Sequence, residues 1–266
     1  MTSPSTPPSA RPTSFDEWLQ ALREQASFFT GLRLDVGAPR WQLADVLPVL
    51  PVIGAGVGLV AGLVFAVVQA LGPGWLAAVL AVASAVLLTR ALHEDGLADT
   101  ADGLGPHGLG TPRRLEIMRD SRNGTFGVLA LALSVLAKVG CIASFGGSTG
   151  LVVLIAAHAV SRAAIAYPLL AFGPAQPDGL GVRVGKPTDN DAWATVAIGL
   201  GLAFLLLLGK GFFVALLAPV AAVAAGVVAA RWIAERIGGY TGDTLGAVQQ
   251  VAEIAFLVVA ALLISG

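Results

Sequence analysis

Apolar runs of about membrane length dominate this sequence and constrain its fold more than any other feature. A helix needs roughly 20 apolar residues to cross a bilayer. Seven runs approach that length, near 46–71, 75–92, 126–145, 151–172, 192–208, 212–230 and 245–264. The chain is only 12% charged, whereas an average soluble domain is about 25% charged. The sequence therefore predicts an all-α, polytopic integral membrane bundle with about seven transmembrane helices.

The ends of the chain are expected to differ from the spans. Residues 1–14 are rich in Pro and Ser and predict a disordered tail. Residues 15–30 predict an amphipathic helix with Ser14 as its cap. Its apolar side indicates a helix in the membrane interface, although ordinary packing is an equally good interpretation. Residues 15–266 then form a single membrane-embedded domain. Gly54, Gly58 and Gly62 predict a close-packing helix face in the first span.

Basic residues mark one side of the membrane. They gather in the N-terminal segment and in the loops near 93–125, 173–191 and 231–244, while the alternate loops contain only Lys210. The positive-inside rule predicts that the long loops are cytoplasmic. Nearly all acidic residues lie in the same segments, so a catalytic site is expected to face the cytoplasm. The net charge of −1 argues against a nucleic-acid partner.

Four carboxylates stand close together in residues 92–103: Glu94, Asp95, Asp99 and Asp102. In a helix, the three aspartates share one face and repel one another. A bound cation would offset this repulsion, and hard oxygen ligands favour Mg²⁺ or Mn²⁺ over zinc. Such a face suits metal-assisted phosphoryl transfer. The alternative is a solvated loop whose aspartates cap helices.

Basic and polar residues near the next predicted span suit phosphate. Arg119 and Arg122 are one helical turn apart, and the planar guanidinium matches phosphate oxygens. Asn123 and Thr125 add polar groups beside them. We favour phosphate contact over simple membrane anchoring for this arginine pair.

Ionisable residues also occur inside the predicted spans. His158 and Arg162 are spaced i, i+4 in the fourth span, and such groups usually face a bundle interior or a cavity. We interpret them as lining a substrate cavity; the alternative is a structural partnership with a carboxylate such as Glu253. Lys138 in the third span has the same two interpretations.

Two later loops complete the candidate residues. The Gly-rich segment 178–186 could bring backbone N–H groups to an anion, with Lys186 as a point charge. Thr241 and Asp243 precede the last span, where either can cap the helix. Asp243 could also bind metal or accept the proton of a hydroxyl nucleophile. Spacing alone does not bring this loop to the acidic cluster.

Taken together, segments 93–103, 114–125, 179–181 with Lys186, and 241–247 resemble the cobalamin synthase family, also called adenosylcobinamide-GDP ribazoletransferase or cobalamin-5′-phosphate synthase. The resemblance implies a Mg²⁺-dependent inner-membrane enzyme of late vitamin B12 synthesis. It would join adenosylcobinamide-GDP to α-ribazole or α-ribazole 5′-phosphate and release GMP. Membrane lipid is the other expected partner, and a homo-oligomer remains open.

The residue patterns described above and the resemblance together assign roles within domain 15–266; the resemblance carries over Asp95, Asp99, Asp102, Arg119, Asp120, Arg122 and Asp243, and the other assignments come from the residues themselves. The predicted metal ligands are Asp95, Asp99, Asp102 and Glu94. The predicted catalytic residues are Arg119, Asp120, Arg122 and Asp243. The predicted substrate-binding residues are Asn123, Thr125, His158, Arg162, Lys186 and Thr241. The segment 28–34 departs from the family's usual Phe-x-Thr-Arg-Leu-Pro pattern, because it lacks the Pro and its Arg is displaced.

Two other functions fit parts of the pattern. The CDP-alcohol phosphatidyltransferases also begin their signature with Asp-Gly, but Ala98 is followed here by Asp99 rather than Arg, and the later pair of aspartates is missing. A cation-coupled transporter would carry its key charges near the membrane midplane and often shows repeated halves. We see no internal repeat, and most charges lie in the loops.

Overall fold

The computed structural model describes residues 11–177 and 180–264, and this part of the chain forms helices and no strands. The predicted all-α class is thus confirmed. Residues 1–10 of the predicted tail, and residues 178 and 179 of the Gly-rich loop, lie outside the described residues. The helices are α1 (Phe15–Phe29), η1 (Leu43–Val49), α2 (Leu50–Leu71), α3 (Gly74–Thr89), α4 (Leu92–Leu104), α5 (Thr111–Met118), α6 (Thr125–Ala143), α7 (Gly147–Ala163), α8 (Ala166–Ala171), α9 (Leu180–Val184), α10 (Asp189–Leu207), η2 (Leu208–Lys210), α11 (Phe212–Ile237) and α12 (Gly242–Ile264).

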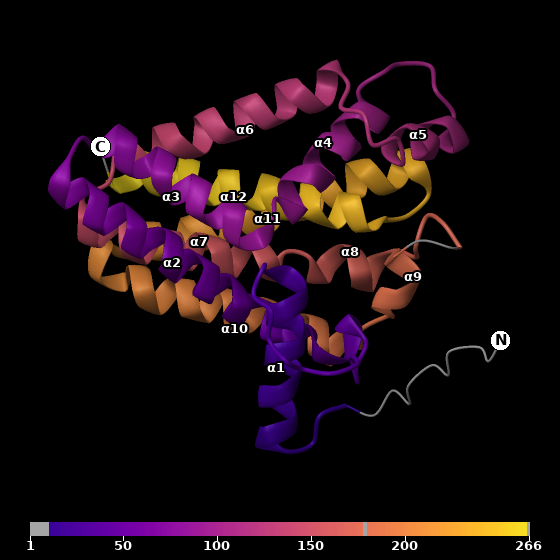
Figure 1. Cartoon of the computed structure of the whole chain (residues 1–266), viewed down its shortest axis with the longest axis horizontal. Coiled ribbons are helices and arrows are strands. Elements are labelled where there is room, and N and C mark those ends of the chain that lie inside the picture. The colour runs from indigo at the N-terminus through magenta and orange to yellow at the C-terminus, as the bar shows by residue number, and fades with distance from the viewer. Residues whose placement is uncertain (1–10, 178–179, 265–266) are drawn as a thin grey trace.

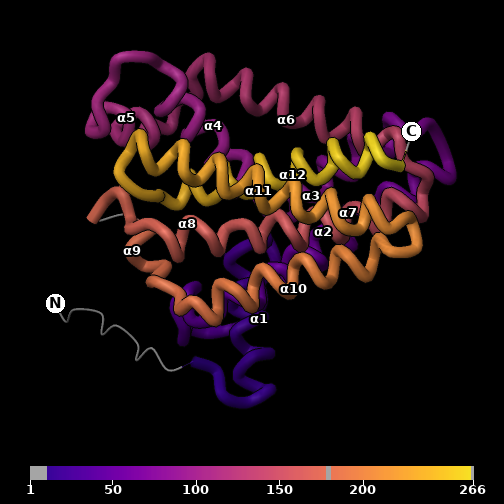
Figure 2. Tube along the Cα trace, turned by 180° about the vertical axis from the view of Figure 1, so that it is seen from behind, coloured from indigo at the N-terminus to yellow at the C-terminus, as the bar shows by residue number. Residues whose placement is uncertain are grey.

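The long helices form a bundle with two different ends (Figure 1). Six helical segments of the described chain are long and apolar enough to cross a membrane, and α3 with α4 makes a seventh if this bent pair is one span. The short connections α2–α3, α6–α7 and α10–α11 lie at the end where the chain finishes. Helices α4, α5, α8 and α9 lie at the opposite end, as the view from behind also shows (Figure 2).

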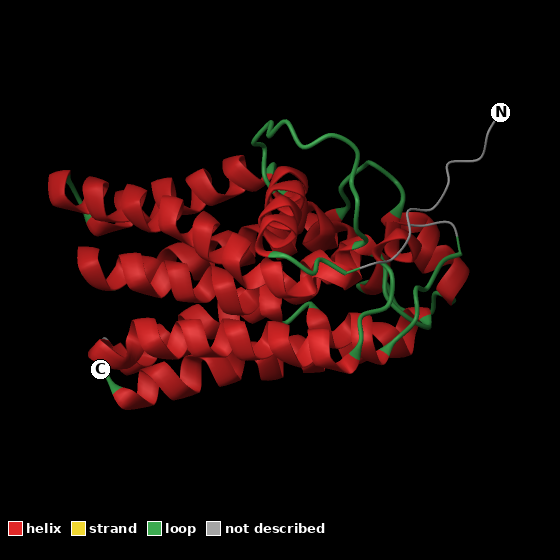
Figure 3. Cartoon of the chain, turned by 90° about the horizontal axis from the view of Figure 1, so that it is seen from below, coloured by secondary structure: helices red, strands yellow, loops and turns green. Residues whose placement is uncertain are grey.

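The charged loops share one end of the bundle. Figure 3 shows most of the longer loops gathered opposite the C-terminus. The predicted grouping of the basic segments on one side is therefore present in the fold. That this end faces the cytoplasm stays a prediction from the positive-inside rule.

The second predicted span differs from the expectation. It ends at Thr89, and the chain turns by 90° before continuing as α4. Arg90 and Ala91 make the turn with φ values of 54° and 55°, a left-handed conformation that is costly for non-glycine residues. Gly31 holds the turn on both sides: its N–H donates to Leu88 O at 2.6 Å, and its carbonyl accepts from Arg90 Nη2 at 3.1 Å. Because of this turn, the acidic residues of α4 do not continue along the axis of α3.

Helix α1 begins as predicted. Ser14 Oγ accepts from Glu17 N, and Glu17 Oε2 accepts from Ser14 N, which completes a capping box. The helix runs across the direction of the long helices rather than along it (Figure 1). Phe15 and Phe28 remain exposed. Its orientation agrees with the prediction that this helix does not span.

The predicted glycine face is confirmed. A Cβ atom on Gly54 or Gly58 would collide with the carbonyl oxygen of His158 or Leu154, so α2 and α7 pack backbone to backbone. The fourth span is interrupted between α7 and α8. Pro168 lies just beyond the break and cannot donate a helical hydrogen bond.

We expect Gly54→Ala to lower the melting temperature of the detergent-solubilised protein. The added methyl meets the α7 backbone, and overpacking typically costs about 1–3 kcal/mol. Gly56→Ala is the matched control, because a Cβ there meets no atom within 4 Å. Circular dichroism during heating measures both variants. Equal melting temperatures would contradict the close packing of α2 on α7.

Candidate active site

The acidic helix and the loop before the last span meet in space. A Cβ on Gly96 of α4 would lie 2.5 Å from the carbonyl oxygen of Asp243, and one on Gly246 would lie 3.2 Å from the Cα atom of His93. Only residues without side chains allow this approach. The contact that the spacing of the sequence left undecided is therefore present, and it places Asp243 beside α4.

Three aspartates are available at this contact. Asp95 is exposed, while Asp99 and Asp243 are partly buried. The carboxyl of Asp99 is partly buried and lies near the like charges of Asp95, Asp243 and Asp102. A divalent cation is the simplest partner for such a group of like charges. The side chains stand apart as placed: among the described residues, no group of three or more His, Cys, Asp or Glu is arranged to hold a metal ion.

Glu94 does not share this group, contrary to our expectation. Its Oε1 atom accepts from Gln250 Nε2 at 3.0 Å and lies 3.6 Å from Lys138 Nζ, inside the bundle. Residues 94 and 95 point in different directions because successive helical residues are about 100° apart. Glu94 therefore joins an internal ion network rather than the aspartates.

Asp102 also has another partner than the one expected. Its Oδ2 accepts from Gly124 N at 2.7 Å, and its Oδ1 accepts from Gly127 N at 2.8 Å. These N–H groups belong to the first turn of α6, where the helix itself offers no carbonyl oxygen to accept their hydrogen bonds. Asp102 is 8% exposed. It caps α6 from a different helix, as in the alternative reading of the cluster.

We expect Asp102→Asn to destabilise the protein by about 1–2 kcal/mol, because the amide can accept only one of the two backbone bonds. Binding of Mn²⁺, followed by electron paramagnetic resonance (EPR), should change little. Thermal unfolding and Mn²⁺ titration of the same sample separate the two effects. Loss of Mn²⁺ binding at unchanged stability would return Asp102 to the metal ligands.

A cavity of about 180 Å³ opens beside Asp243. Arg119 lies on its wall and donates from Nε and Nη2 to Gln176 Oε1 at 3.1 and 2.6 Å. The other lining residues are Pro174, Gly181, Tyr240, Thr241 and Gly242. The cavity thus combines one guanidinium with one carboxylate at the charged end of the bundle.

Backbone pairing fixes the walls of this cavity. Tyr240 N donates to Gly173 O at 3.0 Å, and Ala175 N donates to Tyr240 O at 2.8 Å. The Tyr240 hydroxyl donates to Gly181 O at 3.3 Å. Thr241 then begins α12: its N–H donates to Thr244 Oγ1, and its Oγ1 accepts from Thr244 N. Capping and cavity lining are therefore both roles of Thr241.

Comparison with known proteins identifies the family. The family model described as cobalamin-5-phosphate synthase matches residues 21–261. The chain belongs to the cobalamin-5-phosphate synthase family. No solved structure matches the chain significantly.

Curated relatives agree with this family. An adenosylcobinamide-GDP ribazoletransferase of Allorhizobium ampelinum is 44% identical over 78% of this chain and 82% of its own length. The protein of the same name from Bradyrhizobium diazoefficiens is 43% identical over 90% of this chain and 92% of its own length. A third, from Mesorhizobium japonicum, is 42% identical over 90% of this chain. The family match includes α4, the residues that line the cavity and most of α12.

In this member of the cobalamin-5-phosphate synthase family, several predicted residues lie on the surface beside the cavity. Arg122 donates to both carboxylate oxygens of Asp120, and this hydrogen bond lowers the pKa of Asp120 to about 2. So acidic a group is a weak proton acceptor. Asn123, Thr125 and Lys186 are exposed, and none of them lines the cavity beside Asp243.

His158 and Arg162 lie away from this cavity. They are 4% and 1% exposed, and His158 Nδ1 lies 3.4 Å from Glu253 Oε2. The structural partnership with Glu253, which the sequence left as the alternative, is therefore the one formed. Our prediction that they line the substrate cavity does not match this placement.

Sequence reasoning missed Gln176 and Tyr240. Gln176 orients the Arg119 guanidinium, and Tyr240 links the loop before α12 to the segment 173–175 and to Gly181. Tyr240 directly precedes the segment 241–247, and an aromatic residue in this glycine-rich loop could have indicated its role. Gln176 carried no comparable signal in a single sequence.

Proposed function

We propose that this chain transfers the adenosylcobinamide-phosphate group of adenosylcobinamide-GDP to α-ribazole or α-ribazole 5′-phosphate, with release of GMP. Family membership supports the reaction, and the relatives' names state it for them. The single structural observation behind the proposal is the meeting of the Asp95–Asp99 face with Asp243 beside the Arg119 cavity. This combination of carboxylates and a guanidinium suits a diphosphate substrate.

The reaction exchanges one phosphorus–oxygen bond for another. The 3′-hydroxyl oxygen of the ribazole bonds to the phosphorus attached to cobinamide, and the bond from that phosphorus to the bridging oxygen breaks. GMP leaves with that oxygen. Asp243 accepts the hydroxyl proton, since Asp120 is held too acidic by Arg122. Arg119 donates hydrogen bonds to the developing charge, with Gln176 orienting its guanidinium.

Mg²⁺, or Mn²⁺ in its place, would be held by Asp95, Asp99 and Asp243. Carboxylate oxygens are the donors that these ions prefer, and a cation would offset the like charges around Asp99. When bound, the ion neutralises charge on the diphosphate oxygens. The aspartate side chains would have to rotate to share one ion, because among the described residues no group of three is arranged to hold one.

The proposed location is the cell inner membrane, with the active site facing the cytoplasm. The apolar helices support a multi-pass membrane protein. The basic segments gather at the end that carries α4 and the cavity, so the positive-inside rule directs this end to the cytoplasm. Both substrates would then reach the active site from the cytoplasm.

GMP release by the purified protein in nanodiscs tests the function. The reaction contains adenosylcobinamide-GDP, α-ribazole 5′-phosphate and Mg²⁺, with parallel samples that lack ribazole or contain EDTA. We expect release only in the complete mixture. A folded, Mn²⁺-binding protein that releases no GMP would contradict the proposal and direct attention to CDP-alcohol substrates or cation transport.

A further inference from the structure

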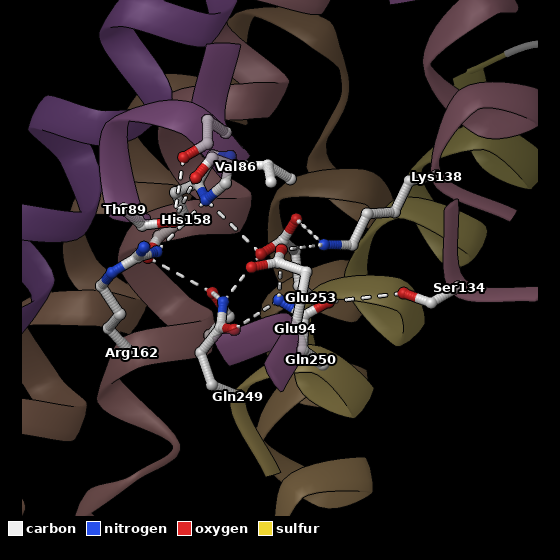
Figure 4. A network of polar contacts seen from close by, with 12 residues as sticks. Val86, Thr89, Glu94, Ser134, Lys138, His158, Arg162, Gln249, Gln250 and Glu253 are labelled. Carbon is white, nitrogen blue, oxygen red and sulfur yellow. Dashed lines mark hydrogen bonds and ion pairs between the residues drawn. The ribbon is translucent and has the colours of Figure 1, made fainter. Parts of the chain in front are cut away.

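A network of buried ionisable side chains crosses the bundle interior and ends on α4 (Figure 4). Lys138 Nζ of α6 lies 3.0 Å from Glu253 Oε1 of α12 and 3.6 Å from Glu94 Oε1 of α4. The three side chains are 5%, 4% and 15% exposed. One ammonium group therefore joins three helices.

Hydrogen bonds extend the network to a fourth helix. Gln249 Nε2 donates to Glu253 Oε2 at 2.7 Å and to Ser161 Oγ of α7 at 2.8 Å. Gln250 Nε2 donates to Glu94 Oε1 at 3.0 Å, and Ser134 Oγ donates to Gln250 Oε1 at 3.4 Å. Glu94 thus has partners on both α6 and α12.

The centre of the network contains two carboxylates, Glu94 and Glu253, and one ammonium group, Lys138. His158 Nδ1 lies 3.4 Å from Glu253 Oε2, and Arg162 Nη1 donates to His158 O at 3.1 Å. Lys138 is 4% exposed and lies within the membrane-length helix α6, so its charge is inside the bundle. Charges at such depth are rare and usually have a functional reason.

The position of Glu94 suggests that reason. It directly precedes Asp95 and follows the turn at Arg90 and Ala91, whose left-handed backbone gives α4 no straight continuation from α3. The orientation of α4 therefore depends on its contacts with neighbouring helices. Asp102 bonds to the start of α6, and Gly96 approaches Asp243 at the start of α12. Glu94 is tied to both α6 and α12, through Lys138 and Gln250.

We propose that Lys138 is a positioning residue: by bridging Glu94 and Glu253, it fixes α4 against α12 so that Asp95 and Asp99 face Asp243. This inference rests on the proposed metal-dependent transfer. Lys138 touches neither the metal site nor the cavity beside Asp243. Its effect on the aspartates therefore passes through the backbone of α4.

Replacement of Lys138 tests the proposal, because the two possible roles of this lysine change cation affinity in opposite directions. In a simple electrostatic field, loss of a positive charge tightens the binding of a cation. Loss of a positioning contact weakens it instead, because the aspartates no longer converge. We expect Lys138→Met to bind Mn²⁺ at least tenfold more weakly in EPR titrations, and to lower kcat with little change in KM for adenosylcobinamide-GDP.

A distance measurement reports α4 without any metal. Spin labels at Leu92→Cys on α4 and Leu262→Cys on α12, both exposed residues, are placed in a Cys141→Ser protein, since Cys141 is the single native cysteine. Double electron–electron resonance should give a narrow distance distribution with Lys138 and a broad one with Lys138→Met. Lys210→Met, at the opposite end of the bundle, should change nothing.

A second variant covers failure to fold. Lys138→Met/Glu253→Gln restores the charge balance without restoring the bridge, so we expect the same broad distribution and weak Mn²⁺ binding. An unchanged distribution in the folded variant, or unchanged or tighter Mn²⁺ binding, would overturn the proposal. If the parent protein binds no Mn²⁺, the proposed metal site fails, while the distance measurement still decides the role of Lys138.

Discussion

Asp95→Asn is expected to lower ribazole-dependent GMP release by about a thousandfold, the upper part of the range for loss of one preorganised electrostatic group. Asp95 is the most exposed aspartate of the α4 face, and no hydrogen bond of a structural kind occupies it in the described chain. Its carboxylate is thus free for an ion. Loss of one anionic oxygen donor should also weaken Mn²⁺ binding.

Matched measurements separate a metal effect from an unfolding effect. Asp35→Asn makes the same change at an exposed position in the loop after α1, and it should keep full activity. Asp95→Asn should melt at the parental temperature, since an exposed side chain adds little stability. Raising Mg²⁺ should recover part of the lost rate. Near-normal turnover of Asp95→Asn would remove Asp95 from the proposed ligands.

Features that depend on local sequence along one helix could be predicted from the sequence alone. Hydrophobic length predicted the spans, the i, i+4 glycines predicted a close-packing face on α2, and Ser14 predicted the start of α1. Each of these depends on local spacing along one helix. Local spacing survives folding, so these predictions were confirmed by the structure.

Residues whose roles depend on a distant partner were harder to predict. Asp102 fits a metal-binding face by spacing, yet its oxygens bond to Gly124 and Gly127, more than 20 residues further along. Glu94 reaches Gln250, 156 positions away. A helical spacing shows which residues share a face, but neighbouring helices decide which members of that face remain free.

The expectation about membrane charges changes in the same way. Charges near the midplane are typical of a transporter. This bundle contains such charges in Lys138 and Glu253, yet they pair with each other, and Lys138 also pairs with Glu94 of the acidic helix. A buried charge thus indicates that a polar partner is near, and the role of the charged residue depends on that partner.

Gly96→Ala is expected to lower kcat for GMP release by about a hundredfold, because a displacement of about 1 Å in a catalytic group has costs of that size. The new methyl would lie 2.5 Å from the Asp243 carbonyl oxygen and 3.0 Å from its Cα atom. Backbone atoms cannot swing away like the end of a side chain. Helix α4 and the start of α12 must therefore separate, and the aspartates with them.

A graded series gives this prediction a stricter test. A Cβ on Gly246 would meet His93 at 3.2 Å, whereas one on Gly140 of α6 meets nothing within 4 Å. The loss of kcat should therefore be largest for Gly96→Ala, smaller for Gly246→Ala and absent for Gly140→Ala. Steady-state GMP release at saturating substrate measures all three. Full activity of Gly96→Ala would show that the chemistry does not need α4 and α12 in contact, and Asp243 would then lose its place beside Asp95 and Asp99.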